Sequence, residues 1–133
     1  MKILHLCSSD TSGGAARSTY RLHTGLRKEG VDSKMLVLKK NSKDPNVIGR
    51  TGYFWKLTAF IYRQVEKTQV RVYCRRKKEI FSVGNISSMD IVSKVRELDP
   101  DIIHLHWING AFINYKQLVQ LGKLNKKNCL DIT

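Results

Sequence analysis

Apolar and polar residues follow two different periods along this chain, and each period predicts one kind of element. Nearly continuous apolar stretches lie in Ile3–Cys7, Lys34–Leu38 and Asp101–Trp107. Such stretches are typical of strands in a parallel sheet that is covered on both faces. Elsewhere, apolar residues recur at spacings of three and four, as they do along one face of a helix. Helices are therefore expected over Gly14–Glu29, Tyr53–Glu79, Ser88–Glu97 and Tyr115–Lys123.

The ends of the first helix carry local signals. Thr11 or Ser12 is expected to cap its N-terminus, and Gly30 is expected to end it. The face that this helix turns inward is expected to comprise Ala15, Thr19, Leu22 and Leu26.

Similar signals delimit the later elements. Ser87 or Ser88 is expected to cap the helix that ends at Glu97, and Asp99-Pro100 is expected to stop it. The turn residues of segment 41–52 predict a loop, and segment 83–86 predicts either a short strand or a loop.

The alternation of strands with helices indicates the fold class. It is typical of βαβ units and predicts an α/β fold with an open, mostly parallel Rossmann-like sheet flanked by helices. With 133 residues, the chain is long enough for one such domain, expected over residues 1–133. Ligands of these sheets bind outside the carboxyl ends of the strands, near the point where strand order reverses. The loops Ser8–Gly14 and Trp107–Asn114 are expected at that edge.

The first of these loops is a candidate for binding a charged sugar derivative. The glycine pair Gly13-Gly14 lets the backbone approach a ligand closely, and the helix N-terminus attracts an anion. Asp10 lies in the same loop, and Arg17 lies one helical turn further on, where it can meet a negative charge. The loop matches neither the dinucleotide-binding fingerprint nor a P-loop. A tight strand-to-helix turn that binds nothing is the alternative.

The second loop offers side chains suited to a sugar. His106 lies at the carboxyl end of its strand, and Trp107, Asn109 and Gly110 follow it. An aromatic ring beside an amide and a glycine suits stacking on a sugar face with a few directed hydrogen bonds. Trp107 as an ordinary core residue is the alternative. No nucleophile elbow or hydrolytic pair of carboxylates is evident, so no catalytic residue is assigned.

Metal ligands of the right types occur, but their spacing is uninformative. His104 and His106 point to one face of their strand, and His5 and Cys7 point to one face of theirs. If the two strands are neighbours, these four side chains could converge on zinc. No close Cys or His pairing of the kind found in zinc sites supports this, and His104 is more readily interpreted as a hydrogen-bonded core residue. We therefore expect no metal and no cofactor.

The formal net charge of +13 is concentrated in residues 50–79, which hold nine Lys or Arg residues against two Glu. The helix expected there combines aromatic residues with a basic stripe. An anionic membrane surface would use both, whereas a nucleic acid would use the basic stripe alone; a solvated basic face is the plain alternative. The candidate anion or membrane patch comprises Trp55, Lys56, Arg63, Lys67, Arg71, Arg75, Arg76, Lys77 and Lys78.

The compartment is expected to be reducing. The three cysteines are an odd number, far apart in the chain, and do not form a disulfide framework. The N-terminus lacks the pattern of a signal peptide, and no apolar stretch reaches the length of a transmembrane helix. We therefore expect a cytoplasmic protein, with peripheral contact at the inner face of a membrane as an option.

Two blocks of this sequence resemble a known family. MKILHLCSSDTSGGAARSTYRLHTGLRKEGVDSKMLV at the start and DPDIIHLHWINGAFINYKQL near the end resemble the N-terminal domain of the family 4 retaining glycosyltransferases with the GT-B fold. The two blocks occur in the order and at about the distance found in bacterial members that build surface polysaccharides or lipopolysaccharides.

The resemblance implies a glycosyl transfer from a nucleotide-sugar donor to a sugar acceptor, often lipid-linked, without a metal. The active site of such enzymes lies between two Rossmann-like domains, and the N-terminal one mainly recognises the acceptor. By this resemblance, Gly13-Gly14 would approach the donor diphosphate, and residues 106–110 would line the same cleft.

The chain also departs from the family pattern. The histidine–aspartate pair expected after the last helix is replaced by Asn128–Thr133. The C-terminal donor domain, with its acidic pair, is not among these 133 residues. We therefore expect the chain to be inactive by itself and to meet a nucleotide-sugar only together with such a domain. The alternatives are a basic nucleic-acid-binding module without catalytic activity and a different α/β domain. Nucleic acid is the less favoured partner, because the chain lacks the strand pattern of single-strand binders.

Overall fold

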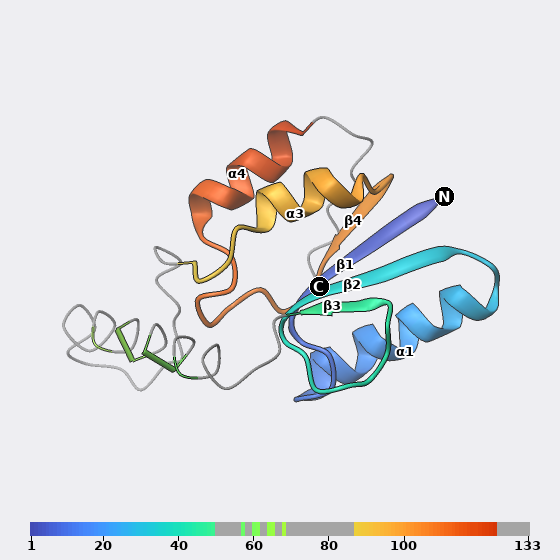
Figure 1. The fold of residues 1–133 in the computed structure, drawn as a ribbon, viewed down its shortest axis with the longest axis horizontal. Helices are drawn as coiled ribbons and strands as arrows, with labels where there is room; N and C mark the ends of the chain where they lie inside the picture. The colour runs from blue at the N-terminus through green and yellow to red at the C-terminus, as the bar shows by residue number, and fades with distance from the viewer. Residues whose placement is uncertain (50–56, 58–59, 62–63, 66–67, 69–86, 125–133) are drawn as a thin grey trace.

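Four strands pair side by side in one sheet whose strands all run in the same direction (Figure 1). The computed structural model describes residues 1–49, 57, 60–61, 64–65, 68 and 87–124. The strands are β1 (Lys2–Ser9), β2 (Asp32–Lys39), β3 (Val47–Gly49) and β4 (Ile102–Leu105). The helices are α1 (Gly14–Lys28), α3 (Ile91–Leu98) and α4 (Tyr115–Lys123). This parallel sheet with helices confirms the predicted α/β, Rossmann-like fold class.

The strand order is β3-β2-β1-β4, so the chain leaves β1 in one direction and later returns to its other side. His5 of β1 lies opposite Met35 of β2 and His104 of β4. Backbone hydrogen bonds between β1 and the β4 segment continue past the strand's ends. The Asp101 N–H donates to the Lys2 carbonyl, and the Ser8 N–H donates to the Trp107 carbonyl. The predicted segment Asp101–Trp107 is therefore paired along its whole length.

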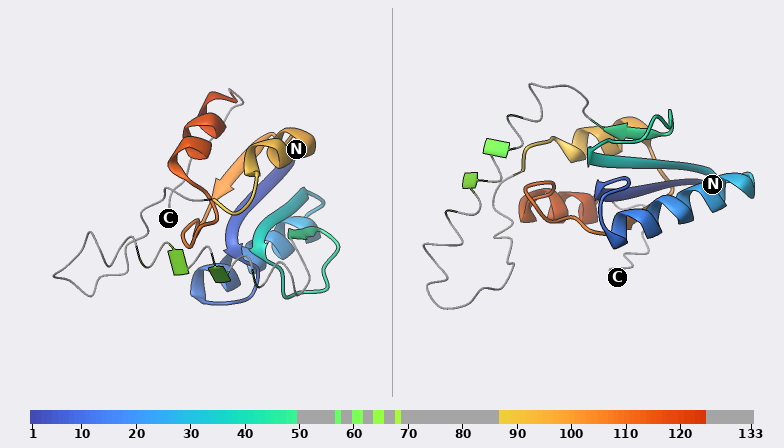
Figure 2. Two further views of the ribbon diagram at one scale, coloured as in Figure 1. Left: turned by 60° about the vertical axis from the view of Figure 1, so that its left-hand side comes forward. Right: turned by 90° about the horizontal axis from the view of Figure 1, so that it is seen from below.

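Each face of the sheet carries its own apolar layer. Even-numbered residues of β1 and β2, such as Leu6 and Leu36, pack with α3, α4 and the fully buried Phe112. Odd-numbered residues such as Met35 and Val37 pack with Ala16 of α1. As a result α1 lies on one side of the sheet and α3 and α4 lie on the other (Figure 2). The alternation of a strand thus assigns each helix to its face.

The inward face of α1 differs from the prediction. Its buried residues are Ala16, Thr19 and His23, whereas Ala15 and Leu22 are exposed. A polar residue is accepted in the interior when it is hydrogen-bonded. His23 meets this condition, because its Nδ1 lies 2.7 Å from the Ser33 hydroxyl oxygen. The prediction did not consider a histidine as an inward residue, and it therefore placed the wrong face of the helix toward the sheet.

The predicted caps of two helices are also wrong. Gly13 occupies the N-cap position of α1, and no side chain caps that helix. Asp90 caps α3 by accepting from the Ser93 N–H at 3.2 Å. The hydroxyls of Ser87 and Ser88 donate instead to the carbonyls of the loop that follows β4, at Phe112 and Ala111. These serines therefore hold a loop in place.

Other boundaries agree with the predictions. Gly30 adopts a φ of +77° just after α1, and Asp99 ends α3 in the left-handed conformation before Pro100. Helix α4 spans the predicted Tyr115–Lys123, and Asn114 and Gln117 form a reciprocal capping box at its start.

Strand β3 lies inside a segment that was predicted to be a loop. The prediction relied on the turn residues around Pro45 and missed a three-residue strand that pairs with β2. Val47 is buried, and a Cβ at Gly49 would come within 2.8 Å of the Lys40 Cβ. A glycine that looked like a turn signal is therefore a point of close packing.

The helix predicted over 53–79 falls mostly outside the described residues, as do segment 83–86 and all nine residues of the candidate basic patch. The described residues of this region are helical and exposed: Leu57, Phe60, Ile61, Gln64, Val65 and Thr68. In the part of the chain that the structure describes, no helix is both long and apolar enough to cross a membrane.

The orientation of α1 can be tested with two substitutions on the same helix. Ala16→Leu is expected to destabilise the protein by about 1–3 kcal/mol, because it overpacks the layer beneath α1. Leu22→Ala is expected to change stability by no more than about 0.5 kcal/mol, because Leu22 is 41% exposed. Urea unfolding of both variants measures the difference. Equal losses would mean that α1 is rotated toward the face predicted from the sequence.

Candidate ligand-binding site

A pocket opens at the carboxyl ends of β1 and β4, where the strand order reverses. Its volume is about 300 Å³. It is lined by Cys7, Ser8, Ser12, Gly13, Gly14, Ala15, Ala16 and Trp107. This is the location at which open parallel sheets bind their ligands.

Trp107 forms one wall of the pocket from the β4 side. The hydrogen bond from the Ser8 N–H to its carbonyl, 2.7 Å long, fixes its backbone beside the end of β1. Its side chain remains 54% exposed. The alternative of Trp107 as an ordinary core residue therefore does not hold. A large aromatic ring held in the open at a pocket is suited to stacking on a ligand.

The other wall is the backbone of the glycine pair. Gly13 adopts φ +95° and ψ 169°, a region that is essentially restricted to glycine. A Cβ placed on Gly13 or Gly14 would meet no atom within 4 Å, so the space in front of both residues is open. No side chain caps α1, and its first turn contains no acidic residue. The first N–H groups of the helix and its partial positive charge are thus left for an anion.

Asp10 has a structural role at this site. Its side chain is fully buried and does not line the pocket. The carboxylate accepts hydrogen bonds from the N–H groups of Asn41, at 3.0 Å, and Ser42, at 2.7 Å. Burial pushes the pKa of this carboxyl upward, but the hydrogen bonds from Ser42 and Asn41 outweigh burial and lower the pKa below its ordinary value. Asp10 therefore ties the glycine loop to the end of β2.

The remaining predicted site residues do not line this pocket. Arg17 is exposed on α1, Asn109 is exposed, and Gly110 lies in a turn with φ +77°. The ring of His106 faces His5 instead. The structure therefore brings together Gly13, Gly14 and Trp107 from the predicted set.

The sequence interpretation did not single out Ser8 and Ser12, two residues that line the pocket. Both lie in the loop that was identified, so their position was available. Nothing in the sequence distinguished them from Ser9, whose hydroxyl accepts from the Ser12 N–H at 3.2 Å.

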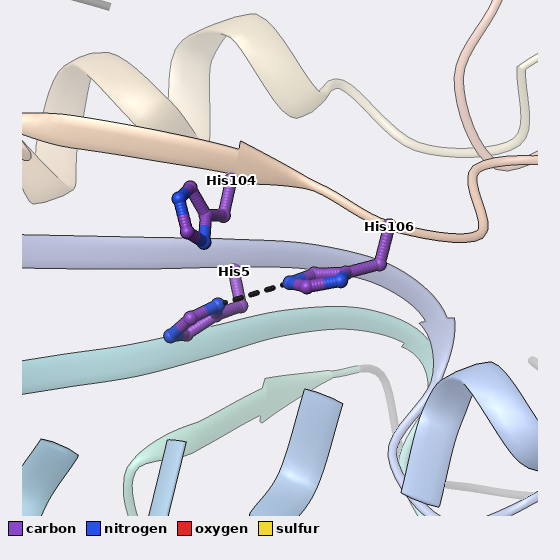
Figure 3. Close-up of side chains that lie close together, drawn as sticks. All are labelled: His5, His104 and His106. Carbon is purple, nitrogen blue, oxygen red and sulfur yellow. Dashed lines mark hydrogen bonds between the residues drawn. The ribbon is translucent and has the colours of Figure 1, made fainter. Parts of the chain in front are cut away.

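A second polar group lies on the sheet face that carries α1 and shares no residue with the pocket lining. One ring nitrogen from each of His5, His104 and His106 lies within 4.8 Å of the other two. His5 is fully buried and the other two are half-buried. Figure 3 shows how the three side chains lie. Burial, followed by repulsion from His106, His104 and His23, lowers the pKa of His5 to about 3. Burial, followed by His104, also lowers the pKa of His106.

Comparisons with known proteins do not add a family to these observations. No family model matches the chain, and searches of curated proteins and of solved structures found no significant match. The fold and the pocket therefore define an open parallel α/β domain with a site at its strand-order reversal.

The backbone of the glycine loop predicts a contrast between two adjacent substitutions. Gly13→Ala is expected to destabilise the protein by about 1–3 kcal/mol, because alanine is strained at φ +95° and ψ 169°. Gly14→Ala is the matched control and is expected to be tolerated, since Gly14 begins α1 with a negative φ and free space around it. Thermal unfolding of the two variants tests this. Similar stability of the two would show that the loop does not need a glycine at 13.

Asp10 predicts a dependence of stability on pH. Because its pKa is lowered by folding, its contribution is present above the unfolded pKa of about 3.9 and is lost as the pH falls through the folded value. Asp10→Asn is expected to cost about 1–3 kcal/mol near neutral pH and progressively less below pH ~4. Glu29→Gln, at an exposed carboxylate, is the control, and its difference in stability from the parent protein should not become smaller at acidic pH. Urea midpoints measured from acidic to neutral pH check both variants. If the difference in midpoint between Asp10→Asn and the parent protein stays constant with pH, the structural role of the Asp10 carboxylate is contradicted.

Proposed function

We propose that this chain is the acceptor-side domain of a retaining glycosyltransferase of family 4 and that its pocket binds a saccharide. The observation that carries the proposal is the pocket at the strand-order reversal, with an open glycine backbone on one side and the exposed Trp107 on the other. In this proposal, transfer from a nucleotide-sugar requires a C-terminal donor domain in addition to this chain. The work of this domain is to hold and orient the acceptor.

The chemistry of the pocket supports a sugar. Trp107 offers an apolar face for the C–H groups of a sugar ring, and Ser8 and Ser12 offer hydroxyls for its polar edge. A volume of about 300 Å³ lies at the lower end of the range for small-molecule pockets, which suits one sugar unit better than a dinucleotide.

The start of α1 supports a phosphate next to that sugar. Its N–H groups lack a side-chain cap, and Gly13 and Gly14 place no side chain in front of them. A diphosphate that links a sugar to a lipid or to a nucleotide would accept these hydrogen bonds. A sugar with an attached diphosphate therefore fits better than a neutral sugar.

The described residues beyond β3 support an acceptor carried by a lipid. Leu57, Phe60, Ile61 and Val65 are helical, lie at spacings of three and four, and are exposed. An apolar helix face of this kind, next to the basic residues of the sequence, suits the surface of an anionic membrane. A nucleic acid would leave these apolar side chains unused.

The test uses Trp107 as its own reporter. The chain has two tryptophans, so Trp55→Phe leaves Trp107 as the only one. The probe is N-acetylglucosamine linked through diphosphate to a polyprenyl chain, in phosphatidylglycerol vesicles. We expect a saturable change in Trp107 emission with these vesicles and a much smaller one with vesicles that lack the probe. UDP-glucose alone should cause little change, because in this proposal the nucleotide-sugar is bound by a different domain.

Gly122→Ala in the same background is the control, since Gly122 lies on α4 with free space around it and should leave the response unchanged. A related set of sugars on the same lipid extends the test to the choice of acceptor. The proposal is overturned if Trp107 responds tightly to nucleotide-sugar alone and ignores every lipid-linked sugar.

A further inference from the structure

Three of the four histidines of this chain lie together on one face of the sheet. The register between β1 and β4 places His5 directly opposite His104. His106 lies two residues further along and therefore points to the same face. Figure 3 shows the three rings close together, two of them carried by the β4 segment and one by β1, with His5 and His106 joined by a hydrogen bond.

One distance within this group matches that between two ligands of a single bound ion, and the third ring lies close by. The ring nitrogens offered by the three residues lie within 4.8 Å of one another, and His5 Nδ1 lies 3.2 Å from His106 Nε2. Two nitrogens that bind the same tetrahedral Zn²⁺, each at about 2.0–2.1 Å, are about 3.3–3.4 Å apart. The His5–His106 pair is therefore almost at coordination distance already, and an ion would replace the proton that the two nitrogens now share.

We propose that His5, His104 and His106 form a binding site for one divalent transition-metal ion, for which Zn²⁺ is the best match. Neutral imidazoles suit Zn²⁺, Ni²⁺ and Cu²⁺, whereas Mg²⁺ and Ca²⁺ require oxygen ligands. Because His104 and His106 are only half-buried, the ion has a path of entry, and a water molecule can provide the fourth ligand.

The hydrogen bonds of these rings distinguish His23 from the other three histidines. The buried His5 Nε2 has no hydrogen-bond partner among the described residues. His23 Nε2 likewise has no such partner, but the Nδ1 of His23 lies 2.7 Å from the Ser33 hydroxyl oxygen and not beside another histidine. His23 is thus a structural histidine on the same side of the sheet.

This site goes beyond the proposed sugar-binding function and does not depend on it. From the sequence we expected no metal, because no close Cys or His pairing of the kind found in zinc sites occurs. The pairing of β1 with β4 fulfils the condition stated there, that the two strands be neighbours. Cys7, which had been considered as a fourth ligand, is not part of the group.

The test is metal binding by the full chain after treatment with a chelator. We expect one Co²⁺ per chain to give the intense visible absorption of tetrahedral coordination, and Zn²⁺ to displace it. Zn²⁺, and not Mg²⁺, should raise the unfolding temperature, because an ion that binds only the folded state stabilises it. The separate variants His104→Asn and His106→Asn should weaken Co²⁺ binding by about 100-fold or more, since even changes to residues that only hydrogen-bond the ligands cost about 10- to 100-fold.

His23→Asn is the matched control and should bind Co²⁺ as the parent does. His104 and His106 are both half-buried, and the unfolding temperatures of the His104→Asn and His106→Asn variants without metal establish that these variants are folded. The proposal is wrong if the parent shows no Co²⁺ absorption. It is also wrong if the ion is retained by the His104 and His106 variants, or if its loss occurs only in the His23 variant.

Discussion

The backbone pairing between β1 and the segment 101–107 is the constraint on which the rest of this structure depends. It joins two parts of the chain that are about a hundred residues apart, through hydrogen bonds that run from Asp101 to Trp107. Because the two strands are parallel, their carboxyl ends meet at one edge. The Ser8 N–H then holds the Trp107 carbonyl, and a glycine loop and an indole ring face each other across a pocket.

The same pairing has a second consequence on the flat of the sheet. Side chains of neighbouring parallel strands in register point to the same face, so His5 and His104 must be adjacent. The pairing of β1 with the β4 segment therefore creates both the pocket and the histidine group. The pocket lies at the carboxyl ends of the paired strands, and the histidine group lies on the face of the sheet formed by the same strands.

The site is held in shape by buried polar contacts around it. The Asp10 carboxylate binds the N–H groups of Asn41 and Ser42, which anchors the glycine loop to the end of β2. On the other side, Ser87 and Ser88 bind the carbonyls of the loop that follows Trp107. Each wall of the pocket is thus held by a segment distant in sequence. Because the loops are already ordered, ligand binding does not have to compensate for the loss of their conformational entropy.

The sequence by itself determined the class of fold, the ends of α4 and the position of the glycine loop, because these follow from local periodicity and from residues that favour one backbone conformation. It did not determine the rotation of α1, since the burial of His23 depends on Ser33 of another strand. It did not reveal β3 either, because a three-residue strand exists only through its pairing with β2. The roles of Asp10 and Ser87, and the meeting of His5 with His106, were likewise decided by tertiary structure. Periodicity records which way a residue points within its own element, whereas the partner that it meets is chosen by contacts between segments far apart in the chain.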